Sequence, residues 1–349
     1  MGHEILPRGP LARGVDSGKI AFRVFCTPNW EGLGDSFRVK GYIFVAWAAI
    51  LWASSGVAGK WMMREGLGLM ELVQFRASFA TLLLGIWLLA KRRDLLRLQL
   101  RDLPILAILG FLMALNNATY FYAIGKIQVG AAILLQYMAP VFVAVYAMAF
   151  WSERITVPKS LALVSALAGC YLVVGGYNLE LLKLNKEGLV GGVAAALCFS
   201  AYTLLSERGM HRHDPWTVLF YAMFTSAIFW HVVVPPGGYA KIFVDLTRLL
   251  GILWVAVMGT VLPFALYLLG INYLRSTRAI VTATLEPISA GLISFLILGE
   301  VMEGLQVIGG LLVIAAIVIL QVDREQQVLA PEVLRRKGKS PPSSYGWVL

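Results

Sequence analysis

Ten apolar runs follow one another between about residues 41 and 320, and short polar segments separate them. Their lengths suit one bilayer crossing each, which takes roughly 20 residues as a helix. The pattern therefore predicts an all-α membrane protein with ten transmembrane helices in a lipid bilayer. We predict the spans at residues 41–63, 68–90, 103–124, 129–150, 158–176, 188–206, 215–234, 250–273, 278–298 and 305–320.

In the two ends of the chain, the apolar residues do not recur with a helical periodicity. Residues 1–40 are basic and rich in Gly and Pro, which predicts a disordered cytosolic tail or an extension upstream of the natural start. Residues 321–349 are polar, which predicts a second disordered cytosolic tail. No cleavable signal peptide is predicted, because the first strong apolar run begins near Tyr42 and has spanning length.

A proline-to-glutamate stretch occurs twice. Glu153 follows Pro140, and Glu300 follows Pro287, at the same spacing of thirteen residues (153 − 140 and 300 − 287). A shift of 147 residues (287 − 140) relates the two stretches and also places Tyr120 on Tyr267. We therefore predict two repeats of five spans joined by a linker, at residues 41–176, 188–320 and 177–187.

Five crossings per repeat is an odd number, so the second repeat enters the membrane from the side opposite to the first. Inverted repeats of this kind are related by a pseudo-twofold axis in the membrane plane and surround a site near the midplane. They permit alternating access, in which one half rocks against the other.

The chain resembles the EamA-type permeases of the drug/metabolite transporter superfamily over about residues 41–320. The resemblance implies ten helices in two EamA repeats and efflux or uptake of small metabolites, commonly amino acids. It also implies a central cavity lined mainly by spans 1, 3, 4, 6, 8 and 9. A symmetric site is not expected, because Phe199 stands at the counterpart of Trp52. The matching residues are Pro140 with Glu153, Pro287 with Glu300, Leu285-Glu286-Pro287, Trp52-Ala53-Ser54-Ser55 and Arg76.

Composition agrees with a membrane protein, at 58% hydrophobic and 14% charged residues. The net charge of +10 could suggest nucleic acid, but the basic residues lie in tails and short loops, so no nucleic-acid partner is predicted. With the N-terminus inside, eleven Lys and Arg fall in cytoplasmic loops and seven in outer loops, which favours two cytoplasmic termini in the inner (plasma) membrane. The eleven are Lys91, Arg92, Arg93, Arg97, Arg101, Arg154, Lys159, Arg208, Arg212, Arg275 and Arg278, and the seven are Lys60, Arg64, Lys126, Lys183, Lys186, Lys241 and Arg248.

No catalytic or metal-binding spacing accompanies the histidines and cysteines. We therefore predict no enzyme activity, no metal and no cofactor. A membrane-embedded transferase would need a polar catalytic cluster near a membrane face, and a receptor or scaffold would not need an inverted repeat.

Glu286 lies deep within the ninth predicted span, directly before Pro287. A carboxyl group at this depth usually faces a cavity or a partner, and it could exchange a proton during transport. The alternative is that it only caps backbone groups freed near Pro287. Pro140 and Pro287 each remove a backbone hydrogen bond, which predicts a hinge or a fixed kink.

Further candidate substrate contacts are polar or aromatic residues within the spans. Asn116 and Tyr120 share a helix face, although interhelical hydrogen bonding would equally explain the amides of Asn116 and Asn117. Aromatic residues also fill ordinary membrane cores, so packing within the bundle is the alternative role for the aromatic residues proposed to line the cavity. The full predicted set is Trp52, Ser55, Asn116, Tyr120, Gln136, Tyr137, Tyr202, Tyr267 and Glu286.

Arg76 is the deepest cation, and we expect a static ion pair with Glu71 rather than a pair that changes between states. Small residues such as Gly169 and Gly309 suit close packing of the fifth and tenth spans, and could serve a homodimer. The sequence thus predicts a transporter for small metabolites, most of all an exporter of amino acids or related compounds. The alternative is a nucleotide-sugar or sugar-phosphate carrier, which would need several cations facing the cavity.

Overall fold

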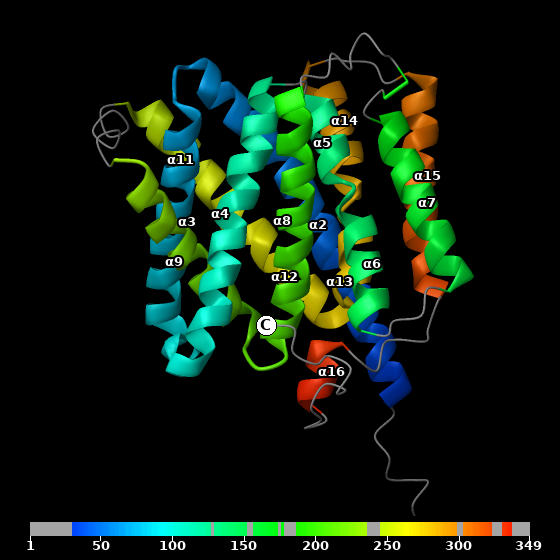
Figure 1. Cartoon of the computed structure of the whole chain (residues 1–349), viewed down its shortest axis with the longest axis horizontal. Helices are drawn as coiled ribbons and strands as arrows, with labels where there is room; N and C mark the ends of the chain where they lie inside the picture. The colour runs from blue at the N-terminus through cyan, green and yellow to red at the C-terminus, as the bar shows by residue number, and fades with distance from the viewer. Residues whose placement is uncertain are drawn as a thin grey trace, which may run out of the picture. The chain divides into compact units, whose positions relative to one another are not determined.

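The computed structural model describes residues 30–126, 129–151, 156–173, 176–177, 186–235, 245–298, 303–322 and 330–336. By their contacts, the described residues from Phe37 onward form one compact unit. Helices make up almost all of the described residues, and no strand occurs among them (Figure 1). The predicted all-α class is therefore confirmed.

Most helices lie close to the predicted spans, and each predicted repeat is interrupted just before its proline, Pro140 or Pro287. The first predicted repeat holds α2 (Trp30–Arg64), α3 (Leu69–Lys91), the 3₁₀ turns η1 (Arg93–Leu96) and η2 (Leu100–Asp102), α4 (Leu103–Lys126), α5 (Val129–Gln136), α6 (Ala139–Phe150) and α7 (Val157–Val173). The second holds α8 (Lys186–Met210), α9 (Pro215–Val233), α11 (Leu246–Ala256), the π-helical turn η4 (Val257–Val261), α12 (Leu262–Leu274), α13 (Ser276–Thr282), α14 (Leu285–Leu298) and α15 (Gly304–Val322). A short helix, α16 (Pro331–Arg336), follows.

Seven helical stretches of the described chain are long and apolar enough to cross a membrane. Two further apolar helices, Val157–Val173 and Gly304–Ile319, are shorter. A multi-pass membrane protein is therefore supported, and the count of ten crossings stays a prediction. The seven stretches are Arg38–Met63, Leu69–Lys91, Leu100–Ala123, Ala132–Phe150, Lys186–Met210, Pro215–Val233 and Leu246–Leu274.

Pro140 and Pro287 lie near the start of a helix rather than in the middle of one. Pro140 is in the first turn of α6, after the break from α5, and Pro287 is in the first turn of α14, after the break from α13. Proline is tolerated there because its missing N–H would have no partner within the helix. In both halves, two turn residues separate the helix that contains the proline from the helix before it.

The two predicted repeats are interlocked rather than side by side. Helix α4 packs against α8 and α9, α3 packs against α9 and α11, and α6 packs against α8 and α13. Helices α7 and α15 pack along each other, as Figure 1 shows. Helices of the two halves therefore pack directly against each other, which is where a shared cavity can form.

Backbone touches backbone between α7 and α15. A Cβ added to Gly309 would lie 2.7 Å from the carbonyl oxygen of Gly169 and 2.8 Å from the backbone nitrogen of Val173. A Cβ added to Gly169 would lie 2.7 Å from the carbonyl oxygen of Gly309. The small residues expected to pack these two spans do so within the chain, and the homodimer stays a prediction.

Gly309→Ala is expected to lower the free energy of unfolding by about 1–3 kcal/mol, because the added methyl group must push two backbones apart. Gly310→Ala is the matched control, because its Cβ would meet only the side chain of Ile288, at 3.8 Å. The control should leave stability unchanged or raise it by up to about 1 kcal/mol through helix propensity. Thermal unfolding in detergent measures both, and equal losses would contradict the backbone contact.

A buried ion pair holds the junction between α12 and α13. Oε1 of Glu207 accepts a hydrogen bond from Nε of Arg275 at 3.0 Å, and Oε2 accepts from the backbone nitrogen of Ser276 at 2.6 Å. Glu207 is fully buried, and Arg275 is 4% exposed. Arg275 has a φ of 77°, which residues other than glycine rarely adopt. The carboxylate therefore fixes a strained junction and caps the first turn of α13.

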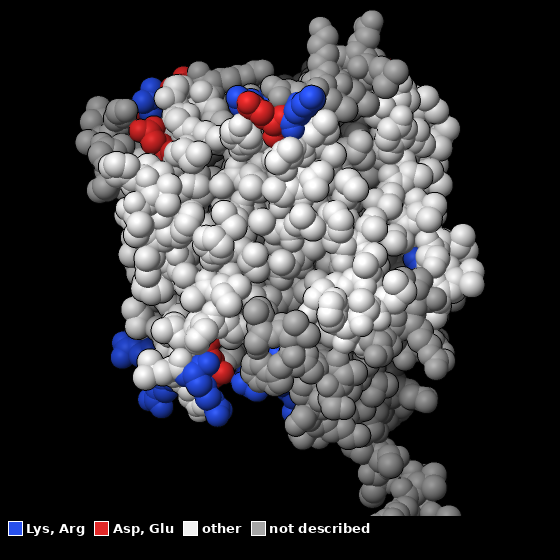
Figure 2. Space-filling model, viewed as in Figure 1, with Lys and Arg blue, Asp and Glu red and all other residues white. Residues whose placement is uncertain are grey.

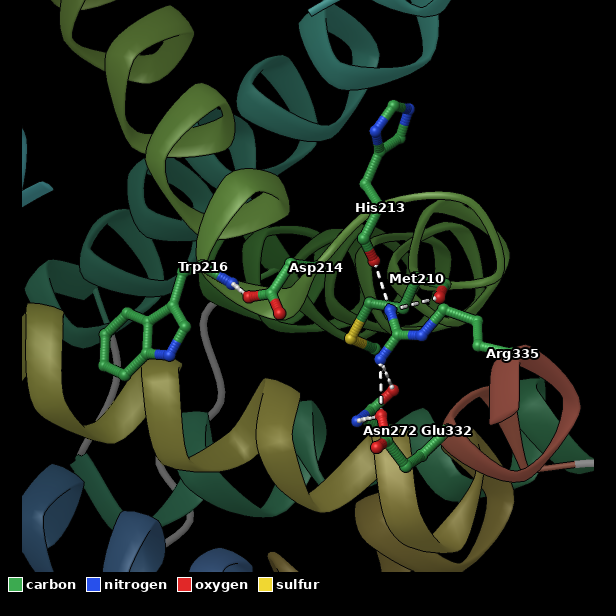
Figure 3. A network of polar contacts seen from close by, with 7 residues as sticks. All are labelled: Met210, His213, Asp214, Trp216, Asn272, Glu332 and Arg335. Atoms are coloured by element: carbon green, nitrogen blue, oxygen red, sulfur yellow. Dashed lines mark hydrogen bonds and ion pairs between the residues drawn. The ribbon is translucent and has the colours of Figure 1, made fainter. Parts of the chain in front are cut away.

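Arg335 fastens α16 to the helices above it (Figure 3). Nη1 donates to the carbonyl oxygen of Met210, the last residue of α8, at 2.8 Å and to that of His213 in the turn that follows. Nη2 donates to the side chain of Asn272 in α12 at 2.9 Å and to that of Glu332 at 2.7 Å. These bonds explain why this part of the C-terminal segment is ordered against the bundle.

The two predicted tails are therefore partly helical. Helix α2 begins at Trp30, inside the segment expected to be disordered, and α16 lies inside the second such segment. Helix α16 forms because the hydrogen bonds of Arg335 join it to residues that are far away in the sequence. Residues 1–29 and 337–349 lie outside the described residues.

Charged side chains gather at the two ends of the face seen in Figure 2 and are scarce between them. At one end, Arg212 lies 3.5 Å from Asp102, which joins the turn after α8 to the loop before α4. In the same region, Thr217 donates to the carbonyl oxygen of Leu95 at 2.8 Å. Loops predicted to be cytoplasmic thus contact each other at one end of the bundle.

Candidate functional site

A small cavity of about 60 Å³ lies inside the bundle. Helices from both predicted repeats line it, namely α2, α3, α4, α5 and then α8, α11, η4, α12 and α14. Six predicted site residues are among its walls: Trp52, Ser55, Asn116, Tyr120, Gln136 and Glu286. The other lining residues are Gly56, Gly59, Arg76, Asn117, Phe121, Phe199, Val255, Gly259 and Phe264.

Trp52 of α2 forms an aromatic wall with residues of the second repeat. Its ring centroid lies 5.1 Å from that of Phe264 and 6.0 Å from that of Phe199, and both pairs meet edge to face. Edge-to-face packing of this kind fixes ring orientation. One side of the cavity is therefore rigid and apolar.

Helix α2 and the π-helical turn η4 approach each other closely at the cavity. A Cβ added to Gly259 would lie 1.9 Å from Oγ of Ser55 and 2.6 Å from its Cβ, so only glycine fits. In the same turn, the hydroxyl of Thr260 donates to the carbonyl oxygen of Val255 at 2.9 Å. Single π-helical turns inside helices are frequent at functional sites, because they turn backbone and side-chain groups out of the regular pattern.

Arg76 of α3 donates to this turn. Its Nε lies 3.1 Å from Oγ1 of Thr260, and its Nη2 lies 3.2 Å from the carbonyl oxygen of Gly259. The guanidinium group also lies 5.8 Å from the ring centroid of Phe121, and the residue is only 6% exposed. The contacts of Arg76 are thus with neutral groups.

The expected ion pair of Arg76 with Glu71 is wrong. Glu71 Oε2 accepts from the backbone nitrogen of Gly68 at 3.1 Å, at the start of α3. Five residues along a helix correspond to roughly 140° around its axis, so the two side chains point in different directions. Among the described residues, no carboxylate forms an ion pair with Arg76.

The adjacent amides of α4 behave differently from each other. Asn117 donates to the carbonyl oxygen of Met113 in its own helix at 2.9 Å, so this bond lies within α4 and not between helices as considered above. Asn116 is 6% exposed, and its Oδ1 has no hydrogen-bond partner among the described residues. A buried acceptor on a cavity wall without a protein partner is a candidate ligand contact.

Tyr137 connects Glu286 to the break before α14. Its hydroxyl lies 2.7 Å from Oε2 of Glu286 and 2.9 Å from the carbonyl oxygen of Ala283. Pro287 has no N–H, so that carbonyl has lost its regular helical donor. One phenol hydrogen cannot fully serve both acceptors, whereas a protonated Glu286 could donate to Tyr137 while Tyr137 donates to Ala283.

The other three predicted contacts are buried but do not line this cavity. They are Tyr137, Tyr202 and Tyr267. The hydroxyl of Tyr267 lies 2.9 Å from that of Thr203. Its ring stacks on Phe199, with centroids 5.5 Å apart, so it supports the wall from behind.

Some lining residues were missed although the sequence carried a signal. Gly56 and Gly59 follow Trp52 and Ser55 at helical spacing, so all four share one face of α2. Val255 of α11 and Gly259 of η4 carried no comparable signal, because only the fold brings these segments next to α2. No cluster of three or more His, Cys, Asp or Glu that could hold a metal occurs among the described residues.

The sequence profile of the EamA-like transporter family matches residues 39–175 and again residues 186–322. The chain belongs to this family. The resemblance to EamA-type permeases and the presence of two EamA repeats are thus confirmed.

Relatives of this EamA protein are transporters by name. An uncharacterised transporter of Archaeoglobus fulgidus is 32% identical over 222 residues, or 63% of this chain and 76% of the relative. The threonine/homoserine exporter RhtA of Salmonella typhimurium is 25% identical over 231 residues, or 62% of this chain and 71% of the relative. A crystal structure with 16% sequence identity covers 82% of this chain and 99% of its own, with a TM-score of 0.66, which shows a shared fold.

Proposed function

We propose that this EamA-family transporter exports amino acids or related small metabolites by alternating access. The observation that carries the proposal is the cavity between the halves, where the ionisable residues Arg76 and Glu286 lie among aromatic residues and neutral polar ones such as Asn116. Ionisable residues inside a membrane are costly and mark substrate or ion pathways. The similarity to a threonine/homoserine exporter supports the choice of substrate class.

The alternative of a nucleotide-sugar or sugar-phosphate carrier receives less support. Arg76 is the only Lys or Arg among the described lining residues, and a substrate with two negative charges would leave one of them without a counter-charge. The transporter names of the relatives likewise weigh against a membrane-embedded transferase.

The proposal includes ten crossings in two inverted repeats, with both termini on the cytoplasmic side of the inner membrane. The Lys and Arg bias between loops supports this orientation, and the grouping of Arg212, Asp102 and Leu95 at one end of the bundle agrees with it. In intact cells, a cysteine placed at Gly2 or Ser344 should resist a membrane-impermeant reagent, and labelling of either would refute the orientation.

Transport of labelled amino acids by the purified full chain in proteoliposomes tests the function. We expect counterflow exchange of at least one neutral amino acid above the level of empty liposomes. Absence of exchange for every amino acid tried would refute the amino-acid proposal.

Proton coupling through Glu286 is the second part of the proposal. Glu286→Gln keeps size and hydrogen bonding but cannot titrate, so it should abolish accumulation driven by a pH gradient. Counterflow at saturating substrate should persist. Wild-type accumulation in Glu286→Gln would eliminate the coupling role, and a stability loss in Glu286→Leu alone would favour a purely structural one.

A further inference from the structure

An arginine and a glutamate line one cavity without pairing with each other. Arg76 approaches from α3 and Glu286 from α14, and no ion pair joins them among the described residues. Tyr120 lines the same cavity, so the three side chains share one small space. A buried charge without a counter-charge is costly, which suggests that a ligand supplies the missing partners.

We propose that the cavity binds the zwitterion of a neutral amino acid, with Arg76 at its carboxylate and Glu286 at its ammonium group. This proposal rests on the proposed export function and names how that substrate is recognised. It assigns opposite ends of the substrate to opposite halves of the protein, since Arg76 lies in the first repeat and Glu286 in the second.

Arg76 has donors to spare. A guanidinium group carries five N–H bonds, and the two hydrogen bonds to Thr260 and Gly259 use one at Nε and one at Nη2. These two bonds hold the plane of the group in place while the remaining donors stay available. A fixed guanidinium group is suited to a carboxylate, which can accept two parallel hydrogen bonds from it.

Glu286 and Asn116 supply the acceptors that an ammonium group needs. Oε2 of Glu286 is held by Tyr137, and no described residue forms a hydrogen bond with Oε1. Oδ1 of Asn116 is also without a partner among the described residues, although it is buried on the same cavity wall. An ammonium group has three N–H donors, so the two side chains can share it.

The other walls restrict the substrate side chain. Trp52, Phe199 and Phe264 form an apolar surface that offers no counter-charge. An additional charge on the substrate would therefore remain unpaired in a desolvated site. Neutral amino acids fit this arrangement, whereas acidic and basic ones do not.

The first test needs no variant. Wild-type protein in proteoliposomes is loaded for counterflow of labelled L-threonine, L-leucine or L-phenylalanine, and the transported one is challenged with its own amide and its own N-acetyl derivative. The amide lacks the carboxylate and the N-acetyl derivative lacks the ammonium group. Each should compete roughly 10- to 100-fold more weakly than the parent, because each loses a charge-assisted contact. Competition by either analogue as strong as by the parent would overturn the proposal.

The second test asks which residue recognises which end. In Arg76→Gln the preference for the parent over the amide should vanish while the preference over the N-acetyl derivative remains. Glu286→Gln should show the reverse pattern. Equal loss of both preferences in both variants would indicate a structural role and overturn the assignment, and thermal unfolding of each variant reports whether the fold has survived.

The two proposals can fail separately. If none of the three amino acids exchanges in the wild type, the amino-acid export function fails and the zwitterion site fails with it. If an amino acid exchanges but its analogues compete equally well, export stands and only the zwitterion site is overturned.

Discussion

Glu207→Ala is expected to lower the free energy of unfolding by about 3–5 kcal/mol, which is the usual cost of removing one partner from a buried ion pair. The alanine leaves the buried guanidinium group of Arg275 without its carboxylate and the backbone N–H of Ser276 without its acceptor. Arg275 also has an unfavourable φ of 77°, so the junction between α12 and α13 loses the contact that offsets its strain.

Two variants separate this effect from a general sensitivity of α8. Glu207→Gln keeps an acceptor for Ser276 and should lose less stability than alanine. Glu187→Ala, in the same helix, removes an exposed ion pair with Lys126 and should change stability little. Thermal unfolding of the three variants in one detergent measures the order. Equal losses in Glu207→Ala and Glu187→Ala would contradict the importance of burial.

The fold could be predicted from the sequence because its signals are local. A transmembrane helix needs a continuous apolar run, and that run is visible without knowledge of its neighbours. The repeated proline–glutamate spacing then related the two halves, and the family profile matches both. The interruptions near Pro140 and Pro287 follow from the missing N–H of proline, which is a local property and visible in the sequence.

The candidate site could be predicted only where it follows the period of one helix. Trp52 and Ser55 share a face of α2, and this face does line the cavity, together with Gly56 and Gly59. Glu286 was recognised because a carboxyl group within an apolar run is costly anywhere.

The remaining parts of the site depend on contacts between distant segments. The hydrogen bonds of Arg76 to Gly259 and Thr260 span more than half the chain, so a nearby acid such as Glu71 was the wrong partner. Tyr137 was predicted as a wall residue, yet its hydroxyl holds Glu286 and the carbonyl of Ala283. Which way a tyrosine points is decided by the neighbouring helices, and the sequence of its own helix does not contain that information.

Gly56→Leu is expected to reduce transport roughly 10- to 100-fold while leaving the fold intact. Gly56 lines the cavity, and a Cβ added there would meet no atom within 4 Å, so the new side chain extends into open space. A substrate bound in the cavity would need the same space. An overlap between the leucine side chain and the substrate that costs about 1–3 kcal/mol corresponds to this loss of substrate affinity.

Two other glycine variants serve as controls for Gly56→Leu. Gly56→Ala adds a single methyl group and should have a smaller effect on the same assay. Gly304→Leu also places its Cβ where no atom lies within 4 Å, but Gly304 begins α15 and does not line the cavity. Initial rates of counterflow, normalised to reconstituted protein, compare the three. Wild-type rates in Gly56→Leu would mean that substrate passes elsewhere, and an equal loss in Gly304→Leu would trace the defect to membrane insertion rather than to the cavity.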